Sequence, residues 1–190
     1  MQSAEYDLKY LQAAVNQLED YLLSEVLFWP IGVREPAGTP PYPKLTLGGL
    51  LLARIRARTM LNSQQDNIKF EQLDTDINQV RTKWTVNWGE KAAREFQVRL
   101  TLWRNYIEEY RVDPDSQYDR YAYEVSRRVQ LELLSHETKS IPSAGFELLK
   151  NLDSFLQTTF VPGHFIWENY LIPGFLADPY WYLYGNLPSA

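Results

Sequence analysis

The clearest hydrophobic pattern of the chain lies between Glu90 and Arg111. Apolar residues recur there at steps of three and four positions, namely Ala92, Phe96, Leu100, Trp103, Ile107 and Tyr110. This spacing places the apolar side chains on one stripe of an α-helix, the arrangement that lets one helix lie along another. The pattern therefore predicts a helix against which the remaining elements pack.

The same stripe continues in the residues that precede this helix. Its members there are Leu73, Ile77, Val80, Trp84 and Trp88. One interpretation is a single long helix over 64–111, and the other is two helices that meet near 87–89. Because the phase of the apolar positions is unbroken, we favour the single helix, with a bend at Gly89.

Apolar residues at helical spacing also predict an amphipathic helix over 4–28, with Ser3 as its N-cap. The helix must end before Pro30, because the residue that precedes a proline avoids the α conformation. Prolines and glycines then crowd the stretch 30–43. That composition predicts an irregular, semi-rigid connection between two helices.

A second helix is predicted from the cap residue Thr46 to about Asn62. Gly48 and Gly49 lie in its first turn, where they either weaken the helix or allow another helix to approach closely. Two further helices are predicted, one over about 115–137 and one that begins at Ser143 and ends near 160. Short connections place successive helices antiparallel. The predicted fold is therefore all-α, a mostly antiparallel helical bundle over 1–160 that is organised on one long helix.

The remaining stretch, 161–190, is expected to be an irregular and aromatic-rich C-terminal tail, with at most a short helical turn at 164–171. Its aromatic residues either fold back on the bundle, which we favour, or form a docking segment for a partner. The candidate partner-binding residues are Phe175, Tyr180, Trp181, Tyr182 and Tyr184.

Composition narrows the class of protein. The 190 residues carry a net charge of −5, which argues against a general nucleic-acid binder. The chain has no cysteine, so disulfides, thiolate nucleophiles and cysteine-bound metals are excluded. The stretch 1–20 lacks the pattern of a signal peptide, and the most apolar run, 45–53, is too short to span a membrane. We expect a soluble, cytoplasmic protein.

The motifs of common enzymes are missing. The sequence contains no nucleophile elbow and no phosphate-binding glycine loop, which argues against an enzyme. The pairs Glu132/His136 and His164/Glu168 differ from the Glu-x-x-His spacing of di-iron bundles. The acidic residues that follow position 112 resemble a calcium loop, but Tyr118 occupies the position that requires glycine. We therefore predict no metal and no cofactor.

Arginines gather at two places in the sequence. These are Arg54, Arg56 and Arg58 on one helix and Arg120, Arg127 and Arg128 on another. Acidic residues lie between them, so ion pairs within the protein are favoured over contact with nucleic acid or an anionic membrane. Trp84, Trp88 and Trp103 share one stripe and are interpreted as core residues, although they could instead line a ligand pocket.

Two functions remain open at this point. The favoured one is a non-enzymatic protein-binding or scaffold protein, whose partner is another protein or a second copy of the chain. The alternative is a small-molecule-binding protein or enzyme with a site inside the bundle that is lined by Trp, Tyr and Arg, including Trp84, Trp88 and Trp103. An enclosed polar cavity beside these tryptophans would favour the alternative.

Overall fold

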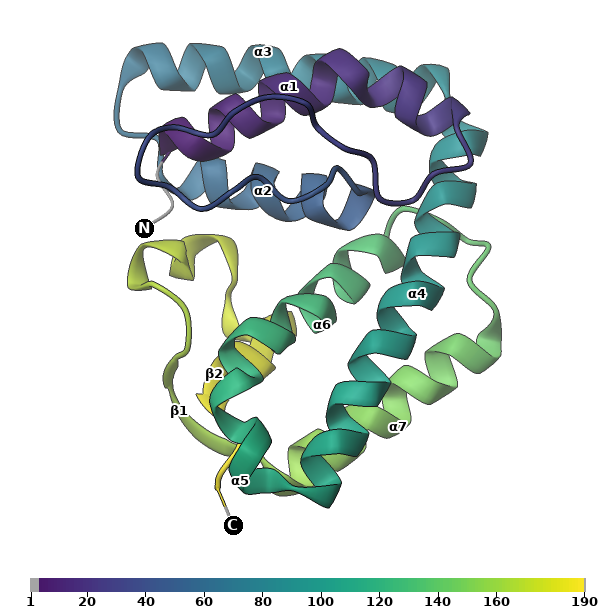
Figure 1. Ribbon diagram of the computed structural model, residues 1–190, viewed down its shortest axis with the longest axis vertical. Helices are drawn as coiled ribbons and strands as arrows, with labels where there is room; N and C mark the ends of the chain where they lie inside the picture. The colour runs from purple at the N-terminus through teal and green to yellow at the C-terminus, as the bar shows by residue number, and fades with distance from the viewer. Residues whose placement is uncertain (1–3, 190) are drawn as a thin grey trace.

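The computed structural model describes residues 4–189, which form an all-α fold that is 72% helical (Figure 1). The longer helices are α1 (Ala4–Leu23), α2 (Leu47–Thr59), α3 (Gln64–Lys83), α4 (Thr85–Val112), α6 (Tyr121–Ser135) and α7 (Ser143–Thr159). Shorter elements are α5 (Pro114–Gln117), η1 (Tyr118–Arg120), β1 (Val161–Phe165), η2 (Asn169–Gly174), α8 (Ala177–Tyr180), η3 (Trp181–Leu183) and β2 (Tyr184–Asn186). The expected N-cap Ser3 lies outside the described residues.

The predicted single helix over 64–111 is wrong, because α3 and α4 are separate helices that meet at Trp84 and not at Gly89. Trp84 has φ −117° and ψ 41°, outside the helical region. In Figure 1, α3 runs across the top of the molecule and α4 turns down from its end. Only one residue leaves the helical conformation, so the periodicity of the apolar positions continues across the break. The helices pack on different partners, α3 on α1 and α4 chiefly on α6.

The predicted stripe of α4 is confirmed as the centre of the core. Its most deeply buried members, Ala92, Phe96 and Trp103, have no exposed surface. The first helix is shorter than predicted and ends at Leu23. Beyond its end, the buried ammonium of Lys91 on α4 donates hydrogen bonds to the carbonyl oxygens of residues 24 and 26, at 2.6 and 3.0 Å. A cation there stabilises the negative end of the helix.

The start of α2 lies against α4 and α6. The cap is confirmed, because Thr46 Oγ1 accepts a hydrogen bond from the Gly49 amide at 3.0 Å. A Cβ atom on Gly48 would lie 2.9 Å from Glu95 Oε1 and 3.2 Å from Gln130 Cβ. Glycine at this position therefore allows the close approach that was one of the two interpretations of the glycine pair.

The proline-rich connection is irregular, as predicted, and Figure 1 shows it passing over α1 and α2. Trp29 and Leu45 form an isolated antiparallel bridge, with N···O distances of 3.0 and 2.8 Å. The Trp29 indole also donates to Gln17 Oε1 on α1 at 2.8 Å. These contacts fix the segment that leads into α2.

The C-terminal tail folds back on the bundle. Its first strand, β1, pairs antiparallel with β2, an element that the sequence analysis did not predict. Gly185 in β2 has φ 151°, and a Cβ atom there would lie 2.2 Å from the Val161 carbonyl oxygen, so the pairing requires glycine. A 3₁₀ turn at Asn169–Gly174 replaces the expected turn at 164–171. The Tyr121 hydroxyl donates to the Tyr182 carbonyl at 2.7 Å and ties the tail to α6.

Candidate functional site

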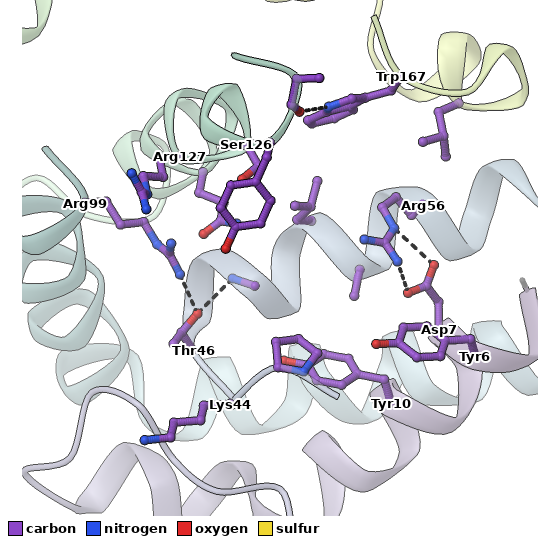
Figure 2. Close-up of a pocket in the computed structure, with 18 of the residues that line it drawn as sticks. Tyr6, Asp7, Tyr10, Lys44, Thr46, Arg56, Arg99, Ser126, Arg127 and Trp167 are labelled. Atoms are coloured by element: carbon purple, nitrogen blue, oxygen red, sulfur yellow. Dashed lines mark hydrogen bonds and ion pairs between the residues drawn. The ribbon is translucent and has the colours of Figure 1, made fainter. Parts of the chain in front are cut away.

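A cleft of about 680 Å³ lies between the layer formed by α1 and α2 and the outer face of α6. It is lined by Tyr6, Asp7, Tyr10, Phe28, Pro43, Lys44, Thr46, Gly49, Leu52, Ala53, Arg56, Arg99, Ala122, Tyr123, Ser126, Arg127, Gln130, Trp167, Glu168 and Leu171. Figure 2 shows that these side chains come from both helical layers and from the tail. The size is within the range of sites that bind small organic molecules.

The N-terminal end of α2 forms one end of this cleft. Glu95 is fully buried and accepts hydrogen bonds from the Gly48 amide at 3.2 and 3.1 Å. It also accepts a hydrogen bond from Arg99 Nε at 2.6 Å, and Arg99 Nη2 donates to Thr46 Oγ1 at 2.9 Å. The positive end of the helix is thus already neutralised by a carboxylate of the protein. The guanidinium of Arg99, and not Glu95, faces the cleft.

An ion pair joins the two helices at the other end of the cleft (Figure 2). Arg56 on α2 donates two hydrogen bonds to the Asp7 carboxylate on α1, at 2.6 and 3.2 Å. The Asp7 side chain is only 1% exposed. Burial raises the pKa of this carboxyl to about 6, although the Arg56 guanidinium acts to lower it. Asp7 therefore titrates above the range of an exposed aspartate.

Two buried polar atoms of the cleft have no hydrogen-bond partner among residues 4–189, namely the Tyr10 hydroxyl and Gln130 Oε1. Tyr10 is 2% exposed and Gln130 is 8% exposed. A buried polar group without a partner costs about 1–3 kcal/mol. Both atoms have almost no accessible surface, so a ligand in the cleft reaches them only where the neighbouring side chains move. Burial raises the pKa of the Tyr10 hydroxyl above its usual range, so it is a neutral donor at physiological pH.

The α6 side of the cleft carries Tyr123, Ser126, Arg127 and Gln130. Arg127 Nη1 pairs closely with Glu124, whose side chain is 1% exposed and does not line the cleft. Glu124 also accepts a hydrogen bond from Arg120 at 2.8 Å. The Tyr123 side chain is 73% exposed. This side of the cleft therefore combines a cation with an uncovered aromatic ring.

The three tryptophans of the sequence-based ligand site do not line this cleft. Trp103 is fully buried and stacks on Tyr106, with ring centroids 5.6 Å apart. Trp88 is 1% exposed, and its indole donates to Glu137 Oε2 at 2.8 Å. Trp84 is half-buried at the junction of α3 and α4. The tryptophans thus occupy core and junction positions, and none of the cavities found among residues 4–189 is lined by all three.

The candidate partner-binding residues of the tail lie together in one aromatic cluster. Phe175 and Tyr182 have no exposed surface, whereas Tyr180, Trp181 and Tyr184 are half-buried. The rings meet edge to face, with the Phe175 and Tyr180 centroids 5.3 Å apart. Three of these residues therefore keep part of their surface accessible.

The possible metal ligands do not converge. His136 is exposed and contacts Glu132 at 3.2 Å, and His164 is exposed on β1. Residues 4–189 contain no group of three or more His, Asp or Glu side chains placed to hold a metal ion. Asp113 of the calcium-like loop instead caps α5, by accepting a hydrogen bond from the Ser116 amide at 3.2 Å.

Arginines of both sequence clusters form ion pairs inside the protein. Arg54 contacts Asp74 at 2.6 Å, and Arg128 contacts Asp153 at 2.8 Å. The cleft was missed because its lining comes from six parts of the sequence, namely α1, the connection, α2, α4, α6 and the tail. The sequence carried one local signal of the cleft, a charged or polar residue within an otherwise apolar helix face or at a helix cap. Asp7 and Thr46 are examples, and both are buried in the structure.

Comparisons of the chain with known protein families, curated proteins and solved structures give no significant match. Within the part of the chain that the structure describes, no helix has both the length and the apolarity needed to cross a membrane.

Proposed function

We propose that this protein is a non-enzymatic binding protein that holds a small organic molecule in the cleft between α2 and α6. The observation that carries the proposal is a cleft of about 680 Å³ whose lining residues Tyr10 and Gln130 each hold a buried polar atom, Oη and Oε1, without a hydrogen-bond partner among residues 4–189. A ligand that hydrogen-bonds to both would remove the cost of leaving them unpaired. The proposal is therefore a form of the small-molecule-binding alternative from the sequence analysis. The Tyr, Trp and Arg residues that line the cleft differ from the tryptophans named there.

The chemistry of the lining supports binding over turnover. The cleft is lined by no histidine and no cysteine, so Ser126 has no imidazole beside it to act as a base. The Asp7 carboxylate is engaged by Arg56 through two hydrogen bonds. Glu168 is the other carboxylate of the lining, and it is exposed to water. The donors and acceptors of the lining are sufficient to orient a bound molecule, which is what a binding protein requires.

The first test fills the cleft. Ser126→Trp places an indole in it, and Ser154→Trp, on the exposed side of α7, is the matched control. Native mass spectrometry of freshly purified protein should detect a small-molecule adduct on the unmodified chain and on the Ser154→Trp variant. The adduct should be absent from Ser126→Trp. An adduct that persists in Ser126→Trp would contradict the proposed site.

The second test removes one unpartnered atom. Tyr10→Phe should leave the unfolding free energy of the empty protein unchanged or raised by up to about 1 kcal/mol, because the lost hydroxyl has no partner among residues 4–189. Tyr121→Phe is the matched control and should cost about 1 kcal/mol, because that hydroxyl donates to the Tyr182 carbonyl. Chemical denaturation measures both changes. Tyr10→Phe should also weaken ligand retention, and equal retention would argue against contact with Tyr10.

The tail remains the second place where binding is proposed. Tyr180, Trp181 and Tyr184 are half-buried, and Leu176 beside them is 61% exposed. These partly exposed side chains support the prediction that another protein, or a second copy of the chain, contacts the tail. A cytoplasmic location and the absence of nucleic-acid binding remain predictions from the sequence.

A further inference from the structure

The charges of the cleft differ from those of the whole chain. The net charge of the protein is −5, yet the lining contains four cationic side chains and two carboxylates. The cationic residues are Lys44, Arg56, Arg99 and Arg127. Two of the carboxylates that neutralise these arginines, Glu95 and Glu124, are 0% and 1% exposed and lie outside the lining. A ligand in the cleft therefore meets the guanidinium groups of Arg99 and Arg127 and not their counterions, whereas Arg56 is accompanied by Asp7.

Hydrogen-bond donors are in excess at the Thr46 end of the cleft. Figure 2 shows Arg99 and Arg127 together at this end, Lys44 on the other side of Thr46 with its ammonium directed away from them, and the Arg56–Asp7 pair at the far end. Within residues 4–189, Arg99 uses Nε and Nη2 and Arg127 uses only Nη1, although each guanidinium carries five N–H groups. Lys44 is exposed and forms no ion pair with the described residues. Unused donors with positive charge match a carboxylate or a phosphate.

The mouth of the cleft is apolar. Phe28 from the connection and Tyr123 from α6 are 40% and 73% exposed, and Trp167 from the tail is half-buried. The Trp167 indole N–H is already used by the Ala122 carbonyl at 2.8 Å, so the ring offers its apolar surface. Deeper in the cleft, Leu52 and Ala53 of α2 continue this surface. An apolar body can therefore be covered while its polar end reaches the cations.

We propose that the ligand is a small organic anion, with a carboxylate or phosphate bound by Arg99 and Arg127 and a flat apolar body against Phe28, Tyr123 and Trp167. The inference rests on the proposed function, because it assigns the chemistry of the molecule that the cleft binds. It makes Arg127 the residue that selects for charge, while Arg99 also holds the buried Glu95.

The test compares probes that share one apolar body. The probes are 2-naphthoate, 2-naphthyl phosphate and the neutral 2-naphthamide, and isothermal titration calorimetry at low salt measures their affinities. At least one anion should bind about tenfold more tightly than the amide, and the tighter of the two identifies the acidic group. High salt should weaken binding of the anions and leave that of the amide unchanged.

Variants separate two statements, that the cleft binds a ligand and that the ligand is an anion. The variant Arg127→Gln should lower anion affinity toward that of the amide, and Lys69→Gln, at an exposed position of α3, is the control that should change nothing. Glu124 keeps its contact with Arg120 in this variant, so the fold is retained. Near-ultraviolet circular dichroism and thermal unfolding of Arg127→Gln should match those of the unmodified protein.

Each outcome decides one statement. Equal affinity for 2-naphthamide and the anions, with loss of all binding in Ser126→Trp, would overturn the inference about charge and leave the binding cleft intact. Probe binding that persists in Ser126→Trp would overturn the cleft itself. Failure of the unmodified protein to bind any of the three probes would overturn the inference, while native mass spectrometry would still decide the proposed function.

Discussion

Arg127 and Arg128 are neighbours on α6, yet their surroundings are opposite. Arg128 is 7% exposed, donates two hydrogen bonds to Asp153 at 2.9 and 2.8 Å and one to Glu132 at 3.0 Å. Its guanidinium also lies 4.6 Å from the centre of the Tyr182 ring. Arg127 faces the cleft and pairs only with Glu124 among the described residues. The Arg128 guanidinium is thus held from several sides and borders only a smaller hollow of about 440 Å³, whereas Arg127 faces the larger cleft.

The difference follows from where the tail lies. The tail covers the Arg128 side with the buried ring of Tyr182, and α7 supplies Asp153. On the Arg127 side the tail contributes only Trp167, Glu168 and Leu171. Aromatic and arginine side chains are present on both sides of α6. The residue types alone therefore do not decide whether aromatic and arginine side chains on α6 form core or a binding site. The segments that pack over them decide it.

Removal of the tail segment that covers the Arg128 side of α6 should have the largest effect on stability. Deletion of 174–190 removes four side chains that are at most 2% exposed, Phe175, Tyr182, Leu183 and Leu187. Burial of each contributes about 1.5–3 kcal/mol, so the loss is on the order of 6–12 kcal/mol, which is comparable to the whole stability of a typical domain. Circular dichroism should show no cooperative thermal unfolding. A truncated chain that melts within about 5 °C of the full one would mean that the tail is not part of the core.

Breaking the ion pair on each side of α6 should lower the unfolding free energy by unequal amounts. Asp153→Ala leaves the buried Arg128 guanidinium without its bidentate partner and should cost about 3–5 kcal/mol. Arg127→Met should cost less than about 1 kcal/mol, because the pair is open to the cleft and Glu124 keeps Arg120. Urea denaturation monitored by tryptophan fluorescence measures both. Equal losses would show that the two sides are equally closed and would remove the contrast.

The smallest expected effect is the pH dependence of stability that comes from Asp7, at the end of the cleft where it pairs with Arg56. The pKa of Asp7 is raised from 3.8 to about 6, so between these values the folded protein holds a proton that the unfolded chain releases. The stability due to this group is therefore greatest below about pH 4 and is lost as the pH rises through 6, a change of about 3 kcal/mol. The measurement is the difference in unfolding free energy between the unmodified protein and Asp7→Asn, which should grow in favour of the unmodified protein from pH 7 to pH 4.

The comparison with Asp7→Asn is needed because other carboxylates titrate in the same range. Their contributions are shared by the two proteins and cancel in the difference. A difference that shrinks on acidification would show that the attraction of Arg56 outweighs burial and that the pKa of Asp7 is lowered. It would also show that this end of the cleft carries a stable charge pair, as the Arg128 side of α6 does.

Local features of the chain could be predicted from the sequence because they depend on neighbours within one or two helical turns. The stripe from Ala92 to Tyr110 is the core face of α4, and Thr46 caps α2. Proline and glycine marked the connection that is irregular in the structure. An all-α fold follows from these local patterns, since each apolar stripe must be covered by another helix.

Only the tertiary structure decided the break at Trp84, the path of the tail and the existence of the cleft. A single non-helical residue leaves the phase of an apolar stripe unchanged, so periodicity cannot distinguish one helix from two that turn toward different partners. The tail has no period at all, and its side chains are placed one by one against α2 and α6. The cleft brings Tyr10, Arg99, Gln130 and Trp167 together from four distant segments. Their burial and their missing partners depend on packing, which no local pattern contains.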